Sequence, residues 1–180
     1  MKSVLISIHP EWCSQIENGL KTIEIRKSRP KISTPFKCYI YCASREKPFD
    51  GGYIGLRKVI GEFCCNDIEP ITPYGGYWAG LKYDTPRTCY TDIIANSKLS
   101  PEKLKEYLGF HKGYAWHISD LVIYDKPKEL SEFRKHGFRT GYKIVNDNRR
   151  GVVSVPFTCE NAPLQRPPQS WCYVQERVFI

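Results

Sequence analysis

Apolar and polar residues alternate over several short stretches of the chain, with the period of two that is typical of β-strands. The clearest case is residues 36–42, where apolar residues on one face alternate with Tyr39 and Tyr41 on the other. In another stretch, Gly61 predicts a bulge or a close approach of two backbones. The pattern predicts strands at residues 2–8, 22–27, 36–42, 58–66 and 113–124.

Two helices are expected between these strands. In the later one, Ser100 is suited to cap the first turn and Pro101 to occupy its first position. Leu104 and Leu108 lie four residues apart and therefore share one face, and Gly109 is expected to end the helix.

The earlier helix follows the first strand directly. Pro10 suits its first turn, and Trp12 and Ile16 form its apolar stripe. Gly19 marks the turn that ends it. Short strands separated by turn residues, with one early helix, favour a small closed barrel over a parallel sheet.

Two intervals lack a regular pattern of apolar residues, and less regular secondary structure is expected there. Prolines, glycines and aromatic residues punctuate residues 67–98, and residues 134–150 carry six cations and one acid. We interpret 134–150 as a basic loop or hairpin, followed by irregular chain to about residue 169. Either interval is a candidate lid or basic arm, or simply a solvated excursion.

The length of 180 residues is near the usual size of one domain. We therefore expect a single domain over residues 1–180, with a decorated middle at 67–112 and a basic C-terminal extension at 134–170. The sequence leaves the oligomeric state open.

Charge favours a polyanionic partner. The chain has 27 lysines and arginines against 19 aspartates and glutamates, a net charge of +8. Such an excess favours nucleic acid through the release of counterions, although many basic proteins bind no polyanion.

Eight cysteines raise the question of disulfides and metals. The apolar run at residues 4–8 is too short for a signal peptide, and no stretch approaches the roughly 20 apolar residues of a membrane span. We therefore expect a cytoplasmic protein with reduced thiols and no membrane association. The spacing of Cys38 and Cys42 on one strand separates them by about 13 Å, too far to share one zinc ion. Most cysteines are interpreted as small buried apolar side chains, and neither a metal nor a cofactor is expected.

Residues 19–26 carry the strongest chemical signal. After the turn at Gly19, Lys21, Glu24 and Arg26 fall within six positions of a strand whose isoleucines point to the other face. Such a cluster on a rigid element, next to a helix end, is a plausible site for a small polar or anionic ligand. The alternative is a solvated strand face with an ion pair of little energetic value.

The spacing Gly-x-Lys-x-x-Glu-x-Arg, preceded by Ile6-x-Ile8-His9-Pro10 and a one-helix spacer, resembles the signature of the ASCH domain family. The resemblance implies an α+β, PUA-like fold: a small β-barrel with flanking helices and a ligand cleft lined by this motif. It extends over residues 2 to about 133, with weaker matches at residues 36–42, 59–63, 116–119 and 167–173.

On this resemblance we expect an RNA- or nucleotide-binding protein of bacterial or phage type, which recognises a nucleotide, or a modified base, in a Lys21–Glu24–Arg26 cleft. Lys21 and Arg26 would contact phosphate or base acceptors, and Glu24 would either orient the lysine or accept from an exocyclic amine. RNA, another single-stranded nucleic acid and a free nucleoside are the expected partners.

Four further residues are candidates for the binding site. Tyr41 and Trp171 are possible stacking platforms for bases, although such rings more often pack in cores. His9 lies at the helix entry, and His117 lies in a family-like segment. The two histidines suit acid–base chemistry only if their rings converge.

An enzyme is the rival hypothesis. Some ASCH-like proteins resemble small amidohydrolases that act on acylated cytidine, and others are linked to ribonuclease activity. The amidohydrolase pattern uses a lysine followed three residues later by a threonine nucleophile, together with a distal glutamate. Here Lys21 matches, but Glu24 stands in place of the threonine and could act only as a general base on water. Whether the protein is an enzyme therefore stays open.

Overall fold

The structure, a computed structural model, describes residues 2–43, 57–74, 82–84, 87–136, 139–147, 151–159 and 163–176. Its main element is a mixed sheet in which seven strands follow the order β2-β6-β4-β3-β1-β10-β7 and β5 pairs with β4. β1 and β3 are parallel, and the other pairs are antiparallel. The strands are β1 (Ser3–Ile8), β2 (Ile23–Arg26), β3 (Phe36–Cys42), β4 (Val59–Tyr74), β5 (Lys82–Asp84), β6 (Gly113–Lys128), β7 (Phe133–Lys135) and β10 (Trp171–Glu176).

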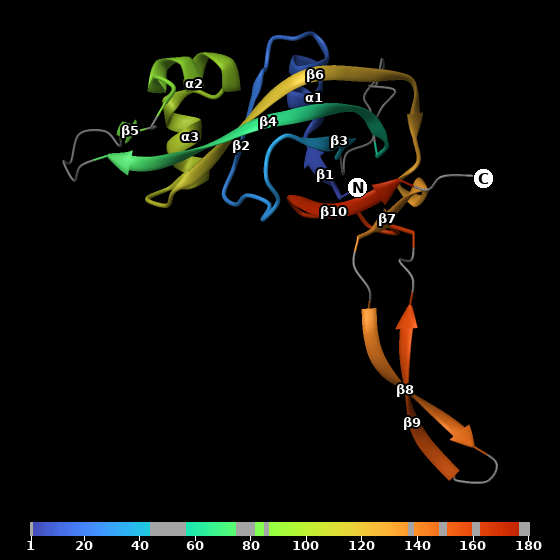
Figure 1. The fold of residues 1–180 in the computed structure, drawn as a ribbon. Coiled ribbons are helices and arrows are strands. Elements are labelled where there is room, and N and C mark those ends of the chain that lie inside the picture. Colours follow the sequence, from blue (N-terminus) through green and yellow to red (C-terminus); the bar gives the residue numbers. More distant parts are fainter. Residues whose placement is uncertain are drawn as a thin grey trace.

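The sheet is open, because β2 and β7 are the two ends of the described path and do not pair with each other. The described strands therefore form an α+β fold without the closed barrel that the sequence led us to expect. The long strands β4 and β6 form a curved ribbon along the body of the molecule (Figure 1). Three register shifts interrupt their pairing, one of them at Gly61.

Gly61 confirms the expected close approach of two backbones. A Cβ at this position would lie 2.4 Å from the carbonyl oxygen of Val122. Only glycine lets β4 and β6 meet at this distance.

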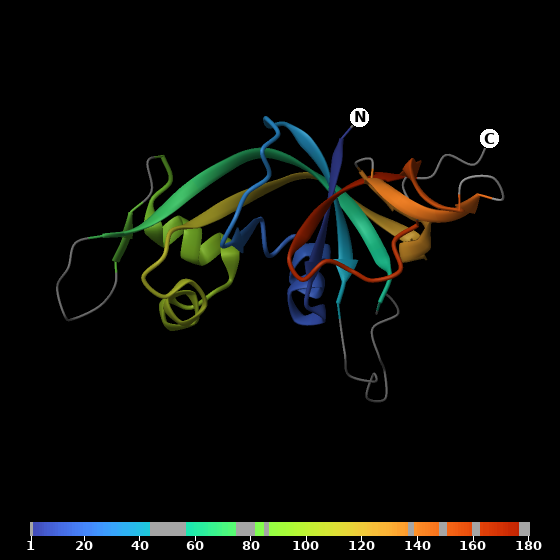
Figure 2. The ribbon, with the colours of Figure 1, turned by 90° about the horizontal axis from the view of Figure 1, so that it is seen from below.

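Three helices accompany the sheet: α1 (Pro10–Glu17), α2 (Tyr90–Ser97) and α3 (Pro101–Leu108). α1 buries Cys13 and Ile16 in the core that contains Trp116, whereas α2 and α3 pack against Ile23 and Ile25. Figure 2 shows α1 and the α2–α3 pair as two separate groups along the β4–β6 ribbon.

Strands at residues 36–42 and helices near Pro10 and Pro101 are confirmed. Ser100 caps α3 as expected, because its Oγ accepts a hydrogen bond from the backbone N–H of Lys103. The expectation of irregular chain from residue 67 is wrong in part, since β4 continues to Tyr74. α2 is a helix that the pattern did not predict.

The basic interval after residue 134 contains a hairpin. β8 (Arg139–Asp147) and β9 (Gly151–Cys159) pair antiparallel as a separate two-stranded sheet, which projects from the body (Figure 1). The prediction of a loop or hairpin is therefore confirmed for β8, and the expectation of irregular chain is wrong for β9. Arg149 and Arg150 lie outside the described residues.

The cysteines of the described residues are free thiols. Cys13, Cys38, Cys42 and Cys65 are buried in the same apolar core, as expected for small apolar side chains. Cys89 is exposed and does not fit that expectation.

Candidate functional site

Lys21, Glu24 and Arg26 form one buried cluster of charges. The Lys21 Nζ lies 3.2 Å from Glu24 Oε2, and the Arg26 Nη2 lies 3.1 Å from Glu24 Oε1. The three residues are only 2%, 7% and 8% exposed, respectively. The structure therefore brings the three heads together and rules out a solvated strand face. We call these residues the charged cluster.

Backbone carbonyl oxygens accept hydrogen bonds from both cations of the cluster. The Lys21 ammonium donates to the Ser97 carbonyl oxygen at 2.6 Å, and the Arg26 guanidinium donates to the Ser7 carbonyl oxygen at 2.5 Å. The Arg26 Nε is buried and has no acceptor among the described residues. With two cations and one carboxylate, the cluster holds one positive charge in excess, which is unfavourable when buried.

The pairing of β2 decides which face of the sheet carries the charged residues. β2 is an end strand of the sheet, and it pairs with β6 on one side only. Directly opposite residues share a face, so Glu24 lies on the face of Trp116, while Ile23 lies on the opposite face with His117. Ile23 and Ile25 are buried against α2 and α3, and this determines the face of β2 on which the charged residues lie.

Side chains from α1 and α3 flank the cluster. The Lys21 Nζ lies 5.2 Å from the centroid of the Trp12 ring, and the Lys103 Nζ lies 5.6 Å from the same centroid. Tyr107, one turn after Lys103, lies close to Arg26 of the cluster. Partial burial raises the pKa of Tyr107, although the nearby Arg26 guanidinium opposes this rise.

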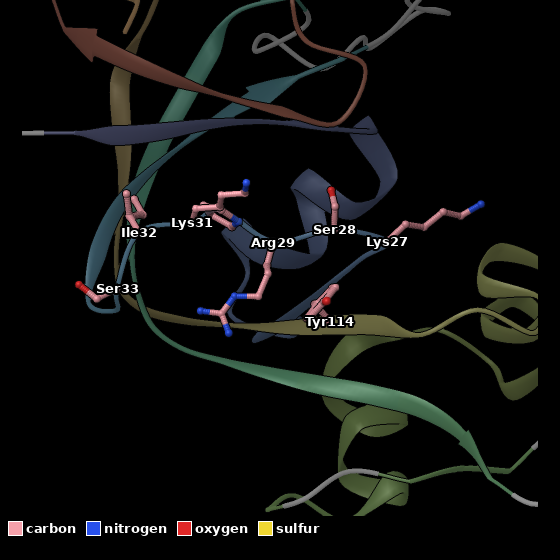
Figure 3. Close-up of a pocket in the computed structure, with 8 residues that line it drawn as sticks. Lys27, Ser28, Arg29, Lys31, Ile32, Ser33 and Tyr114 are labelled. Carbon is pink, nitrogen blue, oxygen red and sulfur yellow. The ribbon is translucent and has the colours of Figure 1, made fainter. Parts of the chain in front are cut away.

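A pocket of about 520 Å³ begins at Lys27, the residue after Arg26 of the cluster (Figure 3). It is formed by the segment between β2 and β3 together with Tyr114 of β6. Its lining residues are Lys27, Ser28, Arg29, Pro30, Lys31, Ile32, Ser33 and Tyr114. We call it the basic pocket. Lys27 belongs to both regions, because its Nζ also lies 5.0 Å from the Tyr107 ring centroid.

Trp171 contacts the basic pocket rather than the charged cluster. Its Nε1 donates to Ser28 Oγ at 3.0 Å, and its ring packs against Trp116 and Tyr173 at centroid distances of 6.0 and 5.5 Å. Trp171 thus supports the wall of the pocket and is partly exposed there.

The structure places the other three candidate residues elsewhere. Tyr41 is 5% exposed and packs in a separate core with Leu5 and Phe133. His117 lies on the sheet face opposite Glu24, where its Nε2 is 3.5 Å from Glu69 Oε2. His9 is exposed and precedes α1, which packs on the Trp116 face, so the two histidines do not converge.

Sequence reasoning missed several residues at the charged cluster. The pattern predicts Trp12 only as part of the apolar stripe of α1, and it gives no indication that Lys103, Tyr107 or the Ser97 carbonyl lies near the cluster. The i, i+4 spacing of Lys103 and Tyr107 shows that they share a face of α3, but nothing local indicates that this face meets β2.

Neither a metal centre nor a membrane segment is found in the described part of the chain. No group of three or more histidine, cysteine, aspartate or glutamate side chains there is arranged to hold a metal ion. No described helix is long and apolar enough to cross a membrane.

These features define a small α+β protein with a buried charged cluster along one edge of its sheet. The chain belongs to the ASCH domain family, whose model matches residues 6–143. The crystal structure of ASCH from Zymomonas mobilis is similar, with a TM-score of 0.51 and 22% identity over 71% of this chain and 73% of that chain. A mutant of that protein gives a TM-score of 0.48 and 20% identity over 72% and 77% of the two chains. At these identities the likeness concerns the fold alone. The sequence matches no curated protein.

Proposed function

We propose that this protein binds a nucleotide, within RNA and with either a normal or a modified base, at the charged cluster. The observation that carries the proposal is the buried excess of positive charge, together with the Arg26 Nε that lacks an acceptor. An anionic oxygen would satisfy this donor and compensate the charge. A phosphate supplies such an oxygen, whereas a base carbonyl would satisfy the Arg26 donor without compensating the charge.

The flanking residues suit the rest of a nucleotide. Trp12 offers a ring for stacking, and Lys103 and Lys27 add positive charge on either side of the cluster. Basic side chains combined with aromatic rings are the general means by which proteins hold single-stranded nucleic acid. The RNA-binding character of ASCH domains in general agrees with this proposal, as does the PUA-like class that the sequence motif implies.

Access to the cluster depends on side chains of α3. The three charged residues are buried, whereas Tyr107 is 37% exposed and Lys103 is exposed. Both have rotatable side chains on the outer face of a short helix. In this proposal they move aside when the ligand enters, and Lys103 then pairs with the ligand.

The test is a fluorescence-anisotropy titration of labelled single-stranded RNA and of nucleoside monophosphates. Arg26→Gln should lower the affinity for RNA and for the monophosphates by about 30-fold or more, because truncating one partner of a buried charge pair weakens binding strongly. If Arg26→Gln fails to fold, Lys103→Ala provides a second test of the same site, because Lys103 is exposed. The matched control is Lys37→Ala on β3, whose ammonium is paired with Glu62 at 2.6 Å. Wild-type protein that binds neither ligand, or binding that survives both variants, would overturn the proposal.

The enzymatic alternative, an amidohydrolase or ribonuclease that uses Lys21 and Glu24, has less support. Both carboxylate oxygens of Glu24 already lie in ion pairs, so neither is available to take a proton from water. Incubation with N4-acylated cytidine and with RNA tests it directly. Turnover by wild-type protein that is lost in Lys21→Met would replace the binding proposal with this alternative.

A further inference from the structure

The basic pocket carries exposed cations without acidic partners. Lys27, Arg29 and Lys31 occupy alternate positions of the segment that leaves β2, and all three are exposed. Within the described residues, none of the three lies within ion-pair distance of a carboxylate. By contrast, the cations at Lys37 and Arg87 do form ion pairs.

The segment that carries these cations is held in place by β10. Ser28 accepts a hydrogen bond from Trp171 Nε1 at 3.0 Å, and the backbone N–H of Lys31 donates to the Tyr173 hydroxyl at 2.6 Å. Pro30, between them, is buried. The pocket is therefore a fixed surface, and its charges are held at defined positions before a ligand arrives.

The pocket continues directly from the charged cluster. Lys27 follows Arg26 in the sequence, lines the pocket and contacts the Tyr107 ring beside the cluster. Figure 3 shows Lys27 extending toward the helices, whereas Arg29 and Lys31 extend to different sides of the segment. The three cations thus extend in different directions from one continuous segment and do not form a cradle around one small ion.

We infer that the basic pocket binds the phosphates of a single RNA strand next to the nucleotide held at the charged cluster. This inference rests on the proposed function and makes it more specific: it assigns the surface that holds the strand next to the recognised nucleotide. Cations without acidic partners that are spaced along one segment can each contact a different phosphate of a strand, and each phosphate that is neutralised releases counterions. Tyr114 in the pocket lining adds an aromatic ring beside them.

The experiment compares a labelled RNA octanucleotide with nucleoside monophosphates on the full chain. Arg29→Ala combined with Lys31→Ala should weaken octanucleotide binding about 10-fold or more at low salt. The double variant should also reduce the slope of log affinity against log salt by about 1.4, since each phosphate contact on a single strand contributes about 0.7. Affinity for monophosphates should change less than twofold.

Two controls separate this inference from the proposed function. Lys105→Ala combined with Lys126→Ala removes the same charge from exposed positions outside the pocket and should leave the salt slope unchanged. If the pocket variant binds the octanucleotide with unchanged affinity and salt slope, the inference is overturned, and the proposed function still stands as long as Arg26→Gln weakens binding. If Arg26→Gln has no effect on either ligand, the proposed function fails instead.

Discussion

Trp12 and Lys103 lie side by side next to Lys21, with the Lys103 Nζ 5.6 Å and the Lys21 Nζ 5.2 Å from the centroid of the Trp12 ring. They belong to α1 and α3, which pack in different cores of the protein. The side chain of Lys21, next to the same ring, is buried. A ligand that reaches the charged cluster must therefore displace or contact this pair.

Trp12→Ala tests the stacking role of this ring. Loss of a base–aromatic contact is worth about 1–3 kcal/mol, so affinity for a nucleoside monophosphate should fall by about 5- to 150-fold. Affinity for ribose 5-phosphate, which has no base, should change little. Isothermal titration of both ligands measures the difference, and Trp12→Phe, which keeps a ring, should retain most of the affinity. Equal losses for both ligands would contradict the stacking role.

Glu24→Gln tests the electrostatic balance of the charged cluster. The substitution keeps the shape of the side chain but leaves Lys21 and Arg26 buried without a counter-charge. Breaking a buried pair in this way destabilises a protein by about 3–5 kcal/mol. Urea unfolding followed by circular dichroism gives the free energy of unfolding.

The exposed pair Lys37–Glu62 provides the control for Glu24→Gln. Its lysine side chain is 45% exposed, so Lys37→Met should change the free energy of unfolding by no more than about 1 kcal/mol. Similar losses for the two substitutions would show that Glu24 does not balance a buried charge.

Glu69 should make stability depend on pH in the acid range. Burial raises the pKa of Glu69, but hydrogen bonds from Thr88 and Arg87 outweigh it and leave this pKa below its usual value. The unfolded state therefore takes up the proton first. The stabilisation that ionised Glu69 contributes is complete above its pKa in the unfolded chain, about 4.3, and is lost as the pH falls through its lower pKa in the folded protein.

Glu69→Gln should remove this pH dependence. We expect a loss of about 1 kcal/mol at pH 7, because a charged acceptor is replaced by a neutral one, and the difference from wild type should shrink below pH 5. Unfolding curves between pH 3 and pH 7 measure it. Glu11→Gln, at an exposed position of α1, should leave the wild-type pH profile in place. A wild-type profile in Glu69→Gln would refute the assignment.

Gly61→Ala should destabilise the β4–β6 ribbon. The added methyl group would lie 2.4 Å from the Val122 carbonyl oxygen, and the backbone of β6 cannot yield as a side chain does. Overpacking of this kind costs about 1–3 kcal/mol, and we expect the upper end. Gly19→Ala meets nothing within 4 Å and suffers only from its φ of +68°, so its thermal midpoint should fall less. A larger fall in thermal midpoint for Gly19→Ala than for Gly61→Ala would count against the close approach of β4 and β6 at Gly61.

Much of the local structure was predictable from residue patterns. The alternation at residues 36–42 and the Ser100 cap depend on neighbours in the sequence, and both are confirmed. The bulge at Gly61 is also confirmed, because a glycine within a strand indicates the close approach of another backbone. α2 was missed because its stripe is short, and the end of β4 was missed because Pro70 and Pro73 indicated a break. Both prolines are accommodated within β4.

For the candidate site, the sequence alone determined which residues carry the charge and that β2 would turn its isoleucines away from Glu24. The tertiary structure decided that these charges are buried and what surrounds them. The Ser97 carbonyl that receives the Lys21 ammonium is 76 residues away in the chain, and Trp12 and Lys103 come from helices in different cores. Alternation within a strand is a property of neighbouring residues. The burial of a charge instead depends on which distant segments pack against it.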